Sequence, residues 1–309
     1  MKKYNHQFLN PAPEFTEFND AAMALLPVPY EGGVSYGHGT ASAPDAILKA
    51  SRHVELYDEV LHQEPYRIGL TTMAPLTDLA DATYMNQSVE NGAGELIDAG
   101  KFLVAMGGDH SITPGLFHAF HKRLPEVGIV QLDAHADLRS KLENDTNSHG
   151  CTMHRIREFN QHTLQIGIQS LSREEGERIR DENISLCTMY QYRKGLFNVE
   201  AALSGLPENV YITLDLDVFD WNVIRSTGTP EPGGFSWPEG LSLIKDIFFT
   251  KTVIGFDVVE LSANKNDPNS AFAAARLIYK LIGFRVWKSV YTKTMDWPDN
   301  PAGNIFSVL

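Results

Sequence analysis

The chain has 309 residues, of which 43% are hydrophobic and 21% charged, and these proportions exclude a disordered or fibrous protein. Its formal net charge is −13 and it contains two cysteines, so we expect no nucleic-acid partner, no anionic-membrane partner and no disulfide framework. No apolar segment follows the basic start, and no apolar run is long enough to span a membrane, which predicts a cytoplasmic protein.

Short apolar segments alternate with longer amphipathic ones along the whole chain. The expected strands span residues 22–28, 67–70, 102–106, 127–133, 164–169, 184–187, 209–217 and 253–260. The expected helices span residues 44–54, 87–100, 111–124, 152–160, 173–182, 237–248 and 270–284. This alternation predicts parallel βαβ units with helices on both faces of a sheet. With no repeat and no linker, we expect one domain over residues 1–309, of which 1–20 form an N-terminal extension.

Three clusters of polar residues follow predicted strands, where an open parallel sheet binds its ligands. They are GGDHSI at 107–112, DAHAD at 133–137 and TLDLDVFD at 213–220, with His110, Asp133, His135, Asp137, Asp215 and Asp217 as candidate ligands. Residues two apart in an extended chain point to the same face. We therefore expect Asp133, His135 and Asp137 to converge if strand geometry continues through the motif.

Carboxylates packed together are costly unless a cation lies between them. Four carboxylates and two imidazoles balance two divalent ions, and an oxygen-rich set with some imidazole suits Mn²⁺, with Ni²⁺ or Co²⁺ as alternatives. Two such ions about 3.5–4 Å apart activate a water molecule for hydrolysis. Each cluster alone is typical of a turn, a helix cap or a structural histidine, but three clusters at three strand ends favour a metal centre.

These motifs, taken in order with SHG at 148–150 and STGTPEPGG at 226–234, resemble the ureohydrolase family, which includes arginases and agmatinases. The resemblance extends from about residue 26 to the last predicted helix. It implies a single three-layer αβα domain with a central, mostly parallel eight-stranded sheet, a centre of two Mn²⁺ ions, and trimers or hexamers. It also implies hydrolysis of a guanidino group to urea and an amine.

The resemblance assigns a role to each candidate residue. One ion would be bound by His110, Asp133, Asp137 and Asp215, and the second by His135, Asp133, Asp215 and Asp217, so that Asp133 and Asp215 bridge. His149 corresponds to a proton-shuttling histidine, Glu260 to the carboxylate that holds the guanidinium group, and Thr229 to a threonine of the substrate loop. Asp217 would also stabilise the intermediate and pass on a proton. By themselves, His149 would be read as a surface histidine and Glu260 as a helix cap or a partner of Lys265.

The substrate is suggested by the loop at 138–148. Arg139 stands where arginases have an asparagine, and the polar segment that reads an amino acid's carboxylate is absent. The pattern is most similar to microbial agmatinases, which implies a small cationic substrate, agmatine, converted to putrescine and urea in polyamine biosynthesis. Trp221 and Gly150 depart from that pattern, and Arg139 or His38 could pair with a carboxylate, so guanidinobutyrate is the next alternative and arginine the third.

Two other classes of protein share part of this pattern. A non-catalytic metal-binding scaffold would be favoured if any ligand, His149 or Glu260 were missing, and none is missing. Metal-dependent deacetylases share the general architecture but carry a different ligand set and a single zinc ion. The full DAHAD and DLD pattern therefore favours the ureohydrolase hypothesis.

Overall fold

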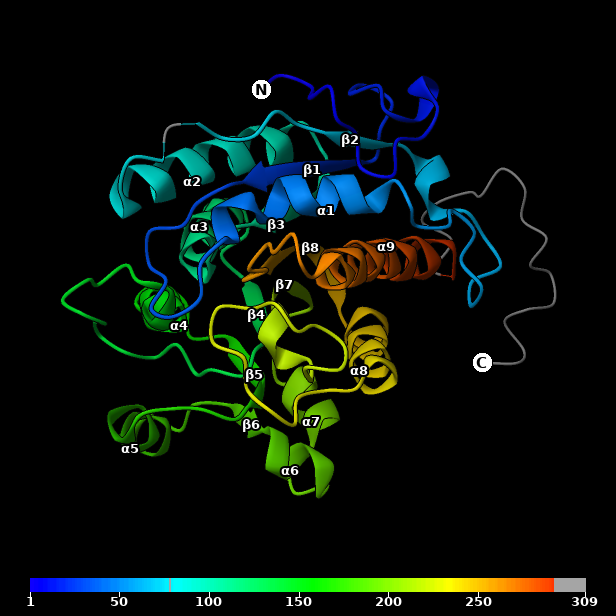
Figure 1. Ribbon diagram of the computed structural model, residues 1–309. Coiled ribbons are helices and arrows are strands. Elements are labelled where there is room, and N and C mark those ends of the chain that lie inside the picture. The colour runs from blue at the N-terminus through cyan, green and yellow to red at the C-terminus, as the bar shows by residue number, and fades with distance from the viewer. Residues whose placement is uncertain (78, 292–309) are drawn as a thin grey trace.

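A sheet of eight strands runs through the middle of the molecule in the order β2-β1-β3-β8-β7-β4-β5-β6 (Figure 1). The computed structural model describes residues 1–77 and 79–291. The strands are β1 (Met23–Val28), β2 (Leu70–Thr72), β3 (Phe102–Gly107), β4 (Val127–Leu132), β5 (Thr163–Ile168), β6 (Leu186–Thr188), β7 (Asn209–Asp215) and β8 (Thr252–Val259). Every pairing between these strands is parallel. The prediction of a central eight-stranded sheet in a single α/β domain is confirmed.

Helices cover both faces of this sheet. They are α1 (Ala43–Ser51), α2 (Ala82–Asp98), α3 (Thr113–Arg123), α4 (Thr152–Arg157), α5 (Arg173–Asp181), α6 (Met189–Arg193), α7 (Val199–Ser204), α8 (Trp237–Thr250) and α9 (Pro268–Tyr291). Residues of α1, α8 and α9 pack into one core, and residues of α2, α3 and α4 pack into the other. Strand β1 serves both, because Met23 and Leu25 enter the first core while Ala24 and Leu26 enter the second. Burial on both faces explains why the strands are almost continuously apolar.

Three expectations about the elements differ from the structure. The strand predicted at 67–70 is wrong, because Pro65–Ile68 forms a 3₁₀ turn that Pro65 begins, and the strand β2 follows Gly69 at Leu70–Thr72. Helix α2 begins at Ala82 rather than at residue 87, because Asp81 caps it by accepting hydrogen bonds from two backbone amides. The short helices α6 and α7 were not predicted.

The N-terminal residues, expected to form an extension, lie along the β2 edge of the sheet. The Tyr4 amide donates to the Thr72 carbonyl at 2.8 Å, and the Phe8 amide donates to Thr72 Oγ1 at 2.9 Å. Phe8 is buried in the core on the α1 side. The segment therefore covers an edge strand whose backbone groups would otherwise be open to pairing with another chain.

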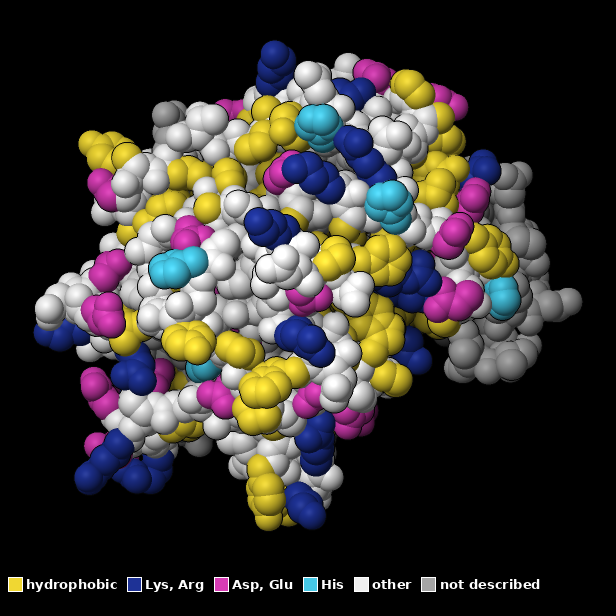
Figure 2. Space-filling view, in the orientation of Figure 1, with side chains coloured by type: hydrophobic (Ala, Val, Ile, Leu, Met, Phe, Trp, Pro, Cys, Tyr) yellow, Lys and Arg dark blue, Asp and Glu magenta, His cyan; other side chains and the backbone are white. Residues whose placement is uncertain are grey.

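The surface seen in Figure 2 carries acidic and basic side chains interspersed with hydrophobic ones. Tyr36 and Trp221, on the loops that follow β1 and β7, are exposed hydrophobic residues. Within residues 1–77 and 79–291, no helix combines the length and the apolar character that crossing a membrane requires.

A buried ion pair joins α9 to the loop that follows α1. Lys280 Nζ lies 3.0 Å from Asp58 Oδ2 and 2.7 Å from Glu59 Oε1. Lys280 and Asp58 are buried, whereas the Glu59 side chain is 61% exposed. Because charges removed from water are costly without a partner, Lys280 and Asp58 depend on each other.

We expect Lys280→Ala to lower the free energy of unfolding by about 3–5 kcal/mol, because it leaves the Asp58 charge buried and without its cation. Urea denaturation followed by circular dichroism would measure the change. As a control, Lys49→Ala removes an ion pair to Asp45 whose side chains are 71% and 56% exposed, and should cost at most about 1 kcal/mol. Equal effects of the two substitutions would contradict the expectation.

Candidate metal centre

The predicted ligands meet at the carboxyl ends of four adjacent strands in the centre of the sheet. Strands β3 and β4 follow one another in the sequence but are not neighbours in the sheet, because β8 and β7 lie between them. His110 follows β3, the DAHAD residues follow β4, Asp215 and Asp217 lie at the end of β7, and Glu260 follows β8. Such a switch point is where open α/β sheets bind ligands.

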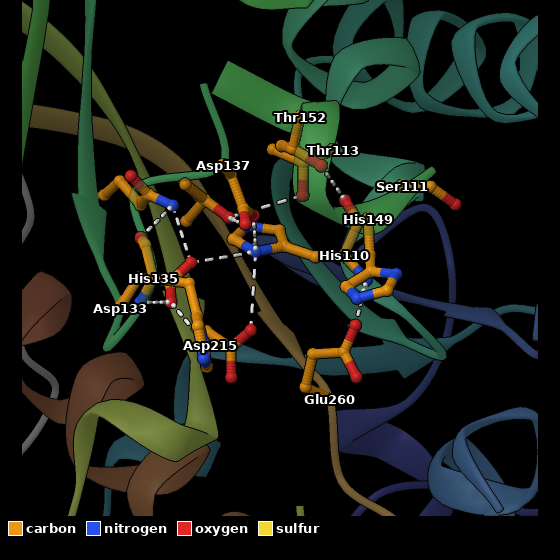
Figure 3. A network of polar contacts seen from close by, with 12 residues as sticks. His110, Ser111, Thr113, Asp133, His135, Asp137, His149, Thr152, Asp215 and Glu260 are labelled. Carbon is orange, nitrogen blue, oxygen red and sulfur yellow. Dashed lines mark hydrogen bonds and ion pairs between the residues drawn. The ribbon is translucent and has the colours of Figure 1, made fainter. Parts of the chain in front are cut away.

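His110 is the centre of the first group (Figure 3). Its Nδ1 atom lies 3.1 Å from Asp133 Oδ2, 3.1 Å from Asp137 Oδ2 and 3.4 Å from Asp215 Oδ2. All four residues are buried, and within the described part of the chain His110 Nδ1 has no hydrogen bond of acceptable geometry. One imidazole nitrogen and three carboxylate oxygens thus surround one point, and no hydrogen bond joins them. Such a set of donor atoms fits a bound cation.

His135 is the centre of the second group. Its Nδ1 atom lies 2.9 Å from Asp217 Oδ2 and 3.6 Å from Asp133 Oδ1. Asp133 thus directs Oδ2 to the first group and Oδ1 to the second, as a bridging carboxylate does, and the two groups are able to hold metal. Asp215 Oδ2 faces the first group, while Oδ1 accepts a hydrogen bond from the Asp217 amide at 2.9 Å, so its bridging role stays a prediction.

The backbone that brings these side chains together is not extended, contrary to the expectation for residues 133–137. Strand β4 ends at Leu132, and Asp137 has a φ of 52°, in the left-handed region. This turn directs Asp137 to His110, whereas His135 meets Asp217. Glu260, with a φ of 67°, is a second non-glycine residue in the left-handed region. Both conformations carry a cost that the surrounding contacts must offset.

When no cation is bound, the surroundings of the centre favour the protonated forms of His135 and Asp137. Burial and the Asp133 charge raise the pKa of Asp137 to about 6. Burial disfavours a charged His135, but hydrogen bonds to Asp133 and Asp217 outweigh it and raise the pKa of His135 to about 12. Metal ions must therefore displace protons from this site.

A chain of hydrogen bonds orients the His110 ring. Its Nε2 atom lies 2.8 Å from Thr213 Oγ1, which donates to Asp257 Oδ1 at 2.7 Å. The other Asp257 oxygen accepts from Tyr211 at 2.9 Å, and all these residues are buried. A proton on Nε2 leaves Nδ1 unprotonated and directed at the carboxylates, as a metal ligand requires.

Two buried glutamines lie behind Asp133, and one of them donates to its carboxylate. Gln131 Nε2 donates to Asp133 Oδ2 at 2.6 Å, and the His135 amide donates to Asp133 Oδ1 at 2.6 Å. Gln165, opposite Gln131 in the β4–β5 register, donates to Gln131 Oε1 and to the Ala136 carbonyl. Both glutamines are fully buried, and their hydrogen bonds to Asp133, to each other and to the Ala136 carbonyl offset part of the cost of placing amides inside the sheet.

Glu260 lies beside the first metal-binding group. Its Oε1 atom accepts a hydrogen bond from the His110 amide at 2.7 Å. Its Oε2 atom faces the loop after β7, 3.1 Å from where a Cβ on Gly228 would stand. Burial and the nearby Asp109 charge raise the pKa of Glu260 well above its usual value. A guanidinium group bound at Oε2 would restore the charged form.

The loop after β1 is held against the motif that follows β3. Asp109 Oδ2 accepts hydrogen bonds from the Gly32 and Gly33 amides, both at 2.8 Å. The approach is so close that a Cβ on Gly108 would lie 1.7 Å from the Tyr30 carbonyl oxygen, which only glycine permits.

His149 contacts this loop from the other side. Its Nδ1 atom donates a hydrogen bond to the Gly33 carbonyl, and its Nε2 atom lies 3.4 Å from Ser35 Oγ. A cavity of about 150 Å³ opens here, lined among others by His149, Thr229, Asp137, Arg139, Leu171 and Ser35. The predicted residues His149 and Thr229 thus lie at the mouth of the site, and their functional roles stay predictions.

Several residues that shape the site were not singled out from the sequence. They are Asp109, Gln131, Gln165, Thr213 and Asp257. Gln131 did carry a signal, because a glutamine inside a short apolar strand next to a ligand motif is expensive to bury without a partner. Asp257 carried a similar signal, as a carboxylate in the apolar strand 253–260. Thr213 and Asp257 meet only through the register of β7 and β8.

The fold and the centre define an α/β protein with two adjoining groups of metal-binding side chains at the ends of its central strands. Residues 21–283 match the Arginase family. The chain is 38% identical over 288 residues to the N(1)-aminopropylagmatine ureohydrolase of Synechocystis sp., covering 90% of this chain and 93% of that protein. It is 28% identical to the agmatinase of Pyrococcus horikoshii, over 92% of this chain and 99% of that protein.

A solved structure agrees with these relatives. The agmatine ureohydrolase of Thermoplasma volcanium superimposes with a TM-score of 0.84 at 27% identity, covering 94% of this chain and 97% of that one. The chain therefore belongs to the Arginase family. The resemblance drawn from the motifs is confirmed.

We expect Gln131→Leu to weaken the binding of divalent metal about 10- to 100-fold, because Asp133 Oδ2 loses the donor that holds it. Isothermal titration with Mn²⁺ and the metal content after dialysis would measure this. Gln87→Leu, on the exposed face of α2, is the matched control and should leave affinity unchanged. Unchanged affinity in Gln131→Leu, with circular dichroism intact, would contradict the positioning role.

We also expect metal affinity to fall as the pH decreases below about 6. Asp137 has a raised pKa, so without metal the folded chain holds a proton that the unfolded chain has lost between about pH 4 and 6. The stability that protonated Asp137 contributes to the metal-free protein is therefore lost as the pH rises through that window. A bound metal ion, by contrast, requires ionised Asp137. Titration with Mn²⁺ at pH 5, 6 and 7 in buffers of different ionisation enthalpy would count the released protons. Proton-independent binding would refute this expectation.

Proposed function

We propose that this chain is a manganese-dependent ureohydrolase that acts on a linear guanidino compound with an amine at its other end. The substrate is agmatine or its N(1)-aminopropyl derivative, and the products are urea and an amine. The observation that carries the proposal is the buried Glu260 carboxylate beside the first metal-binding group, with Oε1 bound to the His110 amide and Oε2 facing Gly228. The names of the relatives support the choice of these two substrates.

Each part of the site has a chemical task in this proposal. Glu260 holds the guanidinium group through a charge-assisted hydrogen bond at Oε2. Bound divalent ions would lower the pKa of water and stabilise developing negative charge. Asp217, at the end of β7, lies where it can hold a proton next to the second group. His149 is only partly buried, so it can exchange protons between the site and solvent.

Arg139 and His38, the two basic residues that could bind a substrate carboxylate, already lie next to acidic side chains. Arg139 Nε lies 3.8 Å from Glu175 Oε2, and His38 Nδ1 lies 3.1 Å from Glu31 Oε1. The His38 side chain is also 77% exposed. This arrangement supports a substrate with a cationic tail over guanidinobutyrate or arginine, whose carboxylates would need an unpaired cation.

Manganese and the assembly state belong to the proposal as well. The oxygen-rich donor set, with one imidazole in each group, suits Mn²⁺, and Ni²⁺ or Co²⁺ are the alternatives. A homo-oligomer, either a trimer or a hexamer, is the expected assembly. Light scattering during size-exclusion chromatography would test it, and a monomer would contradict it.

The decisive experiment measures urea released from agmatine, N(1)-aminopropylagmatine, guanidinobutyrate and arginine by the Mn²⁺-loaded protein. We expect release from the first two, and its loss in Asp133→Ala, because Asp133 contacts both metal-binding groups. Circular dichroism would establish that the variant is folded. Faster release from guanidinobutyrate or arginine would overturn the substrate assignment. No release from any of the four, with two ions bound, would favour a scaffold.

A further inference from the structure

Glu231 is a carboxylate at the mouth of the site that has almost no partner. Its Oε1 atom lies 3.8 Å from His135 Nε2, and its side chain is 32% exposed. The described residues supply Glu231 with no hydrogen-bond donor and no other cation. As a metal ligand through Nδ1, His135 would be neutral, so it would not balance the Glu231 charge.

Three other acidic residues that follow strands β1, β5 and β7 already accept hydrogen bonds from backbone amides. Glu31 Oε2 accepts hydrogen bonds from the Gly39 and Ala41 amides, at 2.8 and 3.1 Å. Glu175 accepts from the Leu138 and Ser172 amides, at 2.9 and 2.6 Å.

Asp220 is occupied in the same way, by the Asn222 and Gly233 amides at 3.1 and 3.0 Å. These carboxylates stabilise the loops that carry them. Glu231 does not, which leaves it available to bind a cation from outside the chain.

Glu231 lies on the same loop that contacts Glu260. The loop at 225–234 passes over Glu260, with Gly228 close to Oε2, and it is fixed there because the Gly37 amide donates to the Gly228 carbonyl at 3.0 Å. Glu231 follows three residues later, so its Cα is at most about 10 Å from that of Gly228. Thr229, between them, lines the cavity. One short loop therefore carries Glu231 and also lies against Glu260.

We propose that Glu231 binds the ammonium nitrogen at the far end of the butyl chain, a nitrogen that agmatine and its aminopropyl derivative share. This inference rests on the proposed function, in which Glu260 holds the guanidinium end. Glu231 then selects the substrate by charge, because it attracts an ammonium group and repels a carboxylate at the same position.

The test compares agmatine with butylguanidine, which has the same guanidino group and carbon chain but no amine. In Glu231→Gln, we expect the KM for agmatine to rise about 5-fold with kcat unchanged, and the KM for butylguanidine to stay the same. Glu200→Gln, on α7, makes the same charge change away from the site and should alter neither value. Metal content should be equal in all three proteins.

The outcomes are separable. Equal losses with both substrates, or lower metal content, would show that Glu231 acts through His135 and would overturn the subsite. Unchanged kinetics with agmatine would overturn it as well. If the unaltered protein releases urea from neither compound nor from N(1)-aminopropylagmatine, the proposed function itself fails, and the unaltered protein alone reveals this.

Discussion

Repulsion among buried carboxylates is the constraint on which the rest of this structure depends. Asp133, Asp137, Asp215 and Asp217 are all buried at the ends of β4 and β7. Burial and mutual repulsion raise the pKa values of Asp137, Asp215 and Asp217, so the ionised set is unfavourable without compensating positive charge. A folded state that contains this cluster therefore needs either protons on its imidazoles and carboxylates or bound cations.

The surrounding fold keeps the cluster in place at some conformational cost. Two non-glycine residues, Asp137 and Glu260, adopt left-handed backbone conformations at the site, and Gly108 permits a backbone contact that no other residue allows. Buried amides and hydroxyls then fix the ligand side chains, through Gln131 on Asp133 and Thr213 on His110. Hydrogen bonds of this kind offset the cost of placing polar groups at the centre of a parallel sheet.

The parts of the structure that depend on local pattern were predictable from the sequence, and those that depend on long-range contacts were not. Buried parallel strands are continuous apolar runs, so seven were located to within a few residues. The segment at 67–70 was wrongly predicted to form a strand, because Pro65 and Gly69 place its first residues in a 3₁₀ turn. The left-handed turn at Asp137 had no signal, since tertiary contacts impose it on a non-glycine residue. The candidate ligands stand in the sequence motifs, and the structure brings them together. Thr213 and Asp257, by contrast, are 44 residues apart and meet only across β7 and β8.

In the proposed function, metal binding and substrate selection come from different parts of the fold, and they have different mechanical requirements. Metal ligands must be held within a fraction of an ångström, which strand ends braced by neighbours on both sides provide. The far end of a linear substrate is flexible, so shape discriminates poorly there and charge discriminates better. At the rim, Arg139 and His38 face Glu175 and Glu31, whereas among the described residues Glu231 has no hydrogen-bond donor and no cation other than His135. Under the proposed function, a single carboxylate on a loop would change which guanidino compound is accepted while the chemistry at the strand ends stays the same.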